Sequence, residues 1–170
     1  MLSRRVARDI DALRKWAAAN RGAVVMDESE PRYVTFFVDI DGPVDSLYEG
    51  ASFTVRCQLP QDFPMKSPSV CFQTRMWHPN IERDTGSVCL DVLRQRWTPV
   101  TTLVMIFSVY LPQLLLYPEP SDPFNEEAAK MMAREPELYA AYVRAHVAKY
   151  ARGDAAAVLP TMGADAAAKV

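Results

Sequence analysis

Apolar residues recur three and four positions apart at the start of the chain, the spacing of one face of a helix. The stripe consists of Val6, Ile10, Leu13 and Ala17. It predicts an amphipathic helix over residues 2–20, with Ser3 placed to cap its N-terminus. The opposite face is basic, which is typical either of a solvated surface or of a docking surface for an acidic partner.

The pattern then changes to that of strands. Residues 51–59 alternate, with Phe53, Val55 and Cys57 on one side and polar residues on the other, as expected for a strand with one buried face. Residues 32–40 and 69–73 are the other predicted strands. Strands joined in series by short turns favour an antiparallel meander.

Helical patterns return after residue 100. Residues 101–116 are apolar nearly all round and predict a buried helix that begins at Thr101 or Thr102. We expect Pro112 to bend this helix, because it removes the hydrogen bond to Ser108.

Two more helices are predicted near the C-terminus. Asn125 is placed to cap the first, which has two glutamates in its first turn. Pro136 suits the first position of the second, which runs to about Tyr150. The alanine-rich residues 152–170 read as a weakly ordered tail, so residues 1–151 form the predicted domain. The order of elements predicts an α+β fold.

Composition narrows the class of protein. The chain has 170 residues, is 49% hydrophobic and 24% charged, and carries a net charge of −2. These values indicate one globular domain and argue against a nucleic-acid binder, which usually has a basic surface. The N-terminus is charged where a signal peptide is apolar, and the longest apolar tract is too short to span a membrane. We expect a protein that does not enter membranes, in a reducing compartment.

Proline marks a long irregular segment. Nine of the thirteen prolines lie between Pro60 and Pro123. Because proline fixes φ and cannot donate to a strand, residues 77–97 are predicted to be an ordered loop, and such long loops are usually functional.

The three cysteines differ in setting. Cys57 lies on the buried side of a strand, and Cys71 is predicted to be a partly exposed, incidental thiol. Cys89 lies in the irregular segment, where a thiol is better placed to react. No spacing indicates a metal site. His146 is expected to pack on a helix rather than serve as a base for Cys89. The residues alone therefore indicate one candidate reactive thiol, Cys89, and no obvious base for it.

Several motifs then resemble those of ubiquitin-conjugating (carrier) enzymes. The active-site resemblance is carried by His78-Pro79-Asn80-Ile81, then Gly86-Ser87-Val88-Cys89-Leu90-Asp91, then Trp97. Further landmarks follow the family order: Tyr48-Glu49-Gly50, Phe63-Pro64-Met65-Lys66-Ser67-Pro68 and Tyr117-Pro118-Glu119-Pro120-Ser121-Asp122-Pro123-Phe124-Asn125. The resemblance implies the family fold: an N-terminal helix, a four-stranded antiparallel sheet, the loop with the cysteine, and three further helices.

It also implies site residues. Cys89 would accept ubiquitin from the activating enzyme as a thioester and pass it to a lysine amine. Asn80 would stabilise the oxyanion or support the loop by hydrogen bonds. Asp122 would orient the amine or serve Asp-Pro turn chemistry. Asp91 is a weaker candidate at the gate of the site, and His78 and Trp97 would hold the loop.

The implied partners are ubiquitin, the activating enzyme, a RING-type ligase and substrate lysines, without nucleic acid or membrane. The matching contact residues are Arg4, Arg5 and Arg8, then Met65, and then Thr98, Pro99 and Val100. No metal or cofactor is implied, since the activating enzyme uses the ATP. The resemblance further suggests a monomer of the cytoplasm or nucleus.

Ser67-Pro68, one additional residue between Asn80 and Cys89, and Pro112 resemble the branch that works with the CTLH/GID ligase. Members of that branch often end in an acidic, serine-rich tail, which this chain lacks. Two other functions stay open: a carrier for another ubiquitin-like modifier, and a non-catalytic scaffold with the carrier fold. A cysteine hydrolase is more distant, because no base is at hand.

Overall fold

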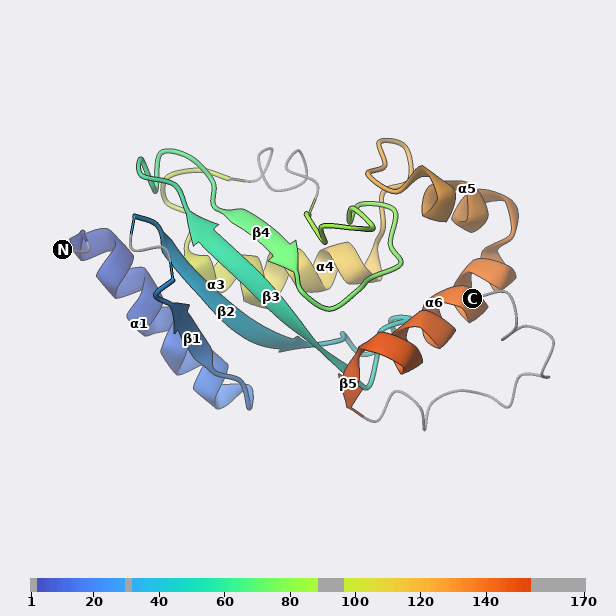
Figure 1. Cartoon of the computed structure of the whole chain (residues 1–170), viewed down its shortest axis with the longest axis horizontal. Coiled ribbons are helices and arrows are strands. Elements are labelled where there is room, and N and C mark those ends of the chain that lie inside the picture. Colours follow the sequence, from blue (N-terminus) through green and yellow to red (C-terminus); the bar gives the residue numbers. More distant parts are fainter. Residues whose placement is uncertain (1–2, 30–31, 89–96, 154–170) are drawn as a thin grey trace.

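The structure is a computed structural model, and it describes residues 3–29, 32–88 and 97–153. Figure 1 shows a twisted sheet, with helix α1 (Arg4–Ala19) along its first strand. Helices α5 (Glu126–Arg134) and α6 (Pro136–Tyr150) lie at the opposite end of the molecule. A further helical stretch crosses behind the sheet. The predicted α+β class is confirmed, with this order of elements.

The sheet is an antiparallel meander. Its strands β1 (Val24–Asp27), β2 (Val34–Asp41), β3 (Ala51–Leu59) and β4 (Ser69–Phe72) are hydrogen-bonded in sequence order. The period-2 pattern of β3 is confirmed, because every second residue from Ala51 to Leu59 is buried. Strand β1 has no such alternation, and the hydrophobic pattern alone did not reveal it.

Helix α1 forms as its apolar stripe predicts. The Ser3 hydroxyl accepts a hydrogen bond from the Val6 N–H at 3.2 Å, which satisfies one of the unpaired donors at the N-terminus. The predicted stripe is buried, and Leu13 and Ala17 are almost fully inaccessible. Burial of this stripe orients the basic face of α1 outward.

The helical stretch behind the sheet is less regular than predicted. It consists of α3 (Leu103–Met105), a π-helical turn η1 (Ile106–Tyr110) and α4 (Leu111–Leu116). The cap is Thr102, whose hydroxyl accepts from the Met105 N–H. The Leu111 N–H bonds back five residues to Ile106, so the wider turn directly precedes Pro112. The expectation of a helix buried all round was wrong, because Met105 and Val109 are exposed.

The two helices predicted near the C-terminus begin as expected. The Asn125 side chain accepts from the Ala128 N–H at 3.0 Å and begins α5 (Glu126–Arg134). Pro136 begins α6 (Pro136–Tyr150), which ends where expected. Residues 152–153, which fall in the predicted tail, form a short strand β5 (Arg152–Gly153) that pairs with the start of β3. Residues 154–170 lie outside the described residues.

Candidate active site

The chain that leads to Cys89 is fixed to the edge of the sheet. The Val88 N–H donates to the Val70 carbonyl at 3.0 Å, and the Phe72 N–H donates to the Gly86 carbonyl at 2.8 Å. Val88 also forms a β-bridge with Ile81, and both side chains are buried. The residue before Cys89 is therefore anchored, whereas Cys89 and Asp91 themselves lie in residues 89–96, outside the described residues.

Gly86 is required by this geometry. Its φ is +70°, a conformation that L side chains rarely adopt. A Cβ at this position would also collide with the Phe72 carbonyl group. Gly86, three residues before Cys89, thus lets the loop approach β4 closely enough to form the hydrogen bond with Phe72.

His78 is buried and uses both ring nitrogens. Its Nε2 lies 2.9 Å from the Leu114 carbonyl oxygen, and its Nδ1 accepts the Asn80 N–H at 3.0 Å. A carbonyl can only accept, so the proton is on Nε2 and the ring is neutral. Burial lowers the pKa of His78 to about 4, although the bond to Leu114 opposes that shift. His78 thereby binds the end of α4, where carbonyl groups lack helical partners, to the start of the loop.

Asn80 is fully buried and joins the loop to a second segment. Its Nδ2 donates to the Glu119 carbonyl at 2.6 Å, and its Oδ1 accepts the Glu119 N–H at 2.8 Å. Both bonds go to main-chain atoms, so the glutamate side chain is not needed for them. The amide nitrogen has a second hydrogen. The observed bonds therefore support the scaffolding function directly, and they use one of the two amide hydrogens.

The same contact positions the segment that carries Asp122. The Pro79 carbonyl accepts hydrogen bonds from the N–H groups of Phe124 and Asn125, both at 2.9 Å. With the Asn80–Glu119 pair, these bonds hold residues 119–125 against residues 79–80. Asp122 lies on this segment with an exposed side chain, so the structure brings the Asp122 loop and Asn80 to the same place.

Trp97 lies where the described chain resumes after the cysteine loop. Its Nε1–H donates to the Pro64 carbonyl at 3.0 Å, and its ring lies 5.6 Å from that of Phe63. It thereby joins the two loops predicted to meet ligases. Met65 on one loop is 70% exposed and Val100 on the other is 82% exposed.

The predicted basic contact residues of α1 differ from one another. Arg4 and Arg8 are exposed. Arg5 instead donates to the carbonyl groups of Pro99 and Thr101, at 2.7 Å each, and pairs with the buried Asp9 at 3.0 Å. Arg5 therefore holds the loop that presents Val100. Sequence reasoning missed this function, because helical spacing cannot show which arginine faces a distant loop.

The other candidate groups have different surroundings. Cys57 is fully buried, and burial raises the pKa of its thiol. Cys71 is partly buried, with its sulfur 3.5 Å from the Ser87 hydroxyl. Within the described ranges, no group of three or more His, Cys, Asp or Glu side chains gathers as a metal site. Over the same ranges, no helix is both long and apolar enough to cross a membrane.

Known proteins resemble this chain in sequence. Residues 5–147 match the family model described as ubiquitin-conjugating enzyme. The chain is 51% identical over 117 residues to ubiquitin-conjugating enzyme E2 5 of Arabidopsis thaliana, covering 69% of this chain but 63% of that protein. It is 42% identical over 145 residues to E2 6 of the same plant, covering 85% and 77% respectively. The chain thus spans about two thirds to three quarters of the length of these relatives.

Solved structures give the same fold. The E2 domain of a Toxoplasma gondii ubiquitin conjugating enzyme superposes with a TM-score of 0.75 at 29% identity, covering 88% of this chain and all of that one. The family model, these relatives and this shared fold lead to one conclusion: the chain belongs to the ubiquitin-conjugating enzyme family.

Proposed function

We propose that this protein accepts ubiquitin from the activating enzyme as a thioester on Cys89 and transfers it, with a ligase, to a substrate lysine. One observation carries the proposal. Asn80 and the Asp122 segment are locked together by paired hydrogen bonds, and the same loop is anchored to the sheet at Val88, directly before the cysteine. Position 89 thus directly follows a residue that is paired with Ile81, the neighbour of Asn80.

The chemistry is two successive acyl transfers. The Cys89 thiolate attacks the thioester carbonyl of ubiquitin on the activating enzyme, and that enzyme's thiolate leaves. A lysine amine then attacks the new thioester, an amide forms, the amine loses a proton and the Cys89 thiolate leaves. The first step exchanges one thioester for another, so its free-energy change should be close to zero. ATP is used by the activating enzyme, so this protein needs no cofactor of its own.

Asn80 would assist where charge develops on oxygen. Its second amide hydrogen could donate to the oxyanion of the tetrahedral intermediate, while the first stays on Glu119. A single donor of this kind contributes roughly 3–4 kcal/mol in other acyl transfers. Asp122, exposed on its segment, would orient and desolvate the incoming amine.

The state of His78 suits a carrier. His78 is two residues from Asn80, yet both its nitrogens are engaged and its pKa is about 4. It therefore cannot take a proton from water at neutral pH. A carrier gains from this, because a base beside the thioester would promote its hydrolysis.

The partner surface is inferred from the two loops joined by Trp97. A RING-type ligase would contact Met65, Thr98, Pro99 and Val100, with Arg4 and Arg8 available to it and to the activating enzyme. The loop features at Ser67-Pro68 and around Cys89 favour the CTLH/GID ligase. We further propose that the protein acts as a monomer in the cytoplasm or nucleus.

The experiment is a charging assay with ubiquitin, activating enzyme and ATP, run on gels with and without reductant. We expect an adduct that reductant removes. Cys89→Ser should give an adduct that resists reductant but is cleaved by hydroxide, because an oxyester replaces the thioester. Cys71→Ser, the matched control on the other partly exposed thiol, should charge like the parent.

Two results would redirect the proposal. A reductant-sensitive adduct on Cys89→Ala would place the acceptor on another thiol. A folded protein that takes no ubiquitin but is charged by another modifier's activating enzyme would identify a carrier for that modifier. A folded protein charged by neither would favour the non-catalytic scaffold.

A further inference from the structure

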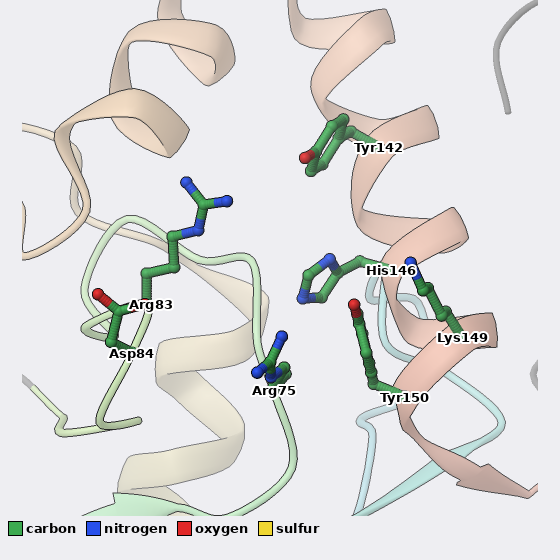
Figure 2. A pocket seen from close by; sticks show the side chains of 7 residues that line it. All are labelled: Arg75, Arg83, Asp84, Tyr142, His146, Lys149 and Tyr150. Atoms are coloured by element: carbon green, nitrogen blue, oxygen red, sulfur yellow. The ribbon is translucent and has the colours of Figure 1, made fainter. Parts of the chain in front are cut away.

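A small cleft lies between the segment that precedes the cysteine loop and helix α6. Figure 2 shows side chains from residues 75–84 on one side and from α6 on the other, facing a common gap. The cleft has a volume of about 130 Å³. It is lined by Arg75, Arg83, Asp84, Tyr142, His146, Lys149 and Tyr150.

Three of these side chains are cations. The Arg75 guanidinium lies 5.5 Å from the centre of the Tyr150 ring, and the Lys149 ammonium lies 5.2 Å from the same centre. Arg83 lies 5.3 Å from the centre of the Trp77 ring. Aromatic faces attract cations and hold these groups in place without neutralising them. The positive charge therefore stays available to a ligand.

The carboxylates near the cleft do not balance this charge. Arg83 contacts Glu127 at 3.4 Å, but both side chains are more than half exposed. Exposed pairs of this kind contribute little and exchange readily. Asp84 lies on the far side of the Arg83 stem in Figure 2, with its carboxylate turned away from α6. The gap thus carries a net positive charge.

His146 adds a neutral donor. Its Nδ1 is buried and has no hydrogen-bond partner among the described residues. A buried donor without a partner is more costly than a buried lone pair, so the proton belongs on Nε2. In Figure 2 the ring edge with the other nitrogen faces Arg75 across the gap. His146 therefore presents an N–H to the space that the cations surround.

The effect of the positive field on His146 is consistent with this picture. Burial lowers the pKa of His146 to about 4, and Lys149, Arg83 and Arg75 lower it further in that order of effect. An anion in the cleft would oppose all three charges at once.

We propose that this cleft binds the phosphate group of a phosphorylated serine or threonine on a partner protein. Arginine side chains match phosphate oxygens with paired N–H donors, and Lys149 and His146 supply further donors. The volume is well below the roughly 300–1,000 Å³ of sites for drug-sized ligands, so a compact group fits better than a nucleotide. The Tyr142 and Tyr150 rings offer apolar contact to the carbon atoms that carry the phosphate, which a free phosphate ion would not use.

The test is a chemical-shift titration of the full, isotope-labelled chain. The probes are a capped Gly-Gly-phosphoserine-Gly-Gly peptide, its unphosphorylated form, and inorganic phosphate. We expect the phosphopeptide to shift signals on both walls of the cleft, and higher salt to weaken binding. Arg75→Gln and Lys149→Gln should each weaken it by about tenfold, as expected for a lost charge-assisted hydrogen bond. Arg134→Gln, on α5 outside the cleft lining, should leave it unchanged.

Three results would overturn the proposal. Equal binding of the unphosphorylated peptide would show that phosphate is not recognised. Unchanged binding in folded Arg75→Gln and Lys149→Gln variants would place the site elsewhere. Binding of inorganic phosphate as tightly as the phosphopeptide would identify a site for the free anion and remove the phosphoprotein partner. The measurement needs no ubiquitin, so its outcome is independent of the activity proposed for Cys89.

Discussion

The two histidines of the chain have a similarly low pKa in contrasting surroundings. His78 is fully buried, and each of its nitrogens has a main-chain partner. His146 is only partly buried, has a buried nitrogen without a partner among the described residues, and faces three cations. The low pKa thus accompanies a fully hydrogen-bonded ring at His78. At His146 it accompanies a ring beside three cations, in the cleft that we propose binds phosphate.

Replacing each histidine by alanine should give the largest difference in the free energy of unfolding. His78→Ala leaves the buried Asn80 N–H and the Leu114 carbonyl unpaired and opens a cavity, so we expect a loss of about 4 kcal/mol in the free energy of unfolding. His146→Ala should lose about 1 kcal/mol, because its surroundings can readjust to solvent. Urea denaturation of both variants measures the difference, and equal losses would contradict it.

The low pKa of His78 should make the free energy of unfolding depend on pH. The pKa of His78 falls from 6.5 unfolded to about 4 folded. The unfolded chain therefore binds the proton first, and stability is lost as pH falls from 6.5 towards 4. For His78 alone the loss is about 3 kcal/mol.

Proton NMR of the two imidazole rings checks these values directly. Both rings should titrate near pH 4. Adding 0.5 M salt, about three times physiological ionic strength, should raise the pKa of His146 and leave that of His78 in place, since salt screens cations but not burial. A midpoint near 6.5 for His78 at either salt concentration would show that its hydrogen bonds do not hold in solution.

Substitution of Asn80 tests whether this residue assists ubiquitin transfer in addition to its hydrogen bonds with Glu119. Asn80→Ala should still be charged with ubiquitin but should transfer it to lysine roughly 100-fold more slowly, because the oxyanion donor is lost. Glu119→Ala is the matched control, since Asn80 binds only the main chain of that residue. Equal transfer rates in folded Asn80→Ala would leave Asn80 a purely structural residue.

The smallest expected effect on stability distinguishes Arg5 from Arg8, two arginines of α1. Arg5→Gln should lower the free energy of unfolding by about 1 kcal/mol, because it removes the two hydrogen bonds to the loop. The amide nitrogen of the glutamine takes the place of the Arg Nε and can still donate to Asp9. Arg8→Gln, on the exposed face, should change stability by less than about 0.5 kcal/mol. The same denaturation experiment measures both, and a larger loss for Arg8→Gln would reverse the assignment.

Local signals predicted much of the fold. The apolar stripe of α1, the alternation of β3 and the caps at Ser3, Thr102 and Asn125 depend on neighbours in sequence, and each appears as expected. Strand β1 was implied only by the family resemblance, because four half-exposed residues give no clear period. The π-helical turn before Pro112 likewise has no distinct spacing, since it differs from an α-helix by one residue in its hydrogen bonds.

The site could be predicted only where motifs are contiguous. His78, Asn80 and Asp122 were found by resemblance, and the structure shows how main-chain bonds to Glu119 and Pro79 bring them together. The contacts of Arg5 with Pro99 and Thr101, and the cleft between Arg75 and α6, could not be found in this way. Each joins residues that are far apart in sequence, and periodicity says nothing about which exposed cations meet across a gap.

Intact mass spectrometry of the charged protein shows whether Cys89 carries ubiquitin as a thioester. After incubation with activating enzyme, ubiquitin and ATP, we expect one ubiquitin per chain on the parent protein and on Cys71→Ala, removed by thiol treatment. Cys89→Ala should gain no thiol-sensitive ubiquitin. A thiol-sensitive adduct on folded Cys89→Ala, or none on the parent, would contradict the account.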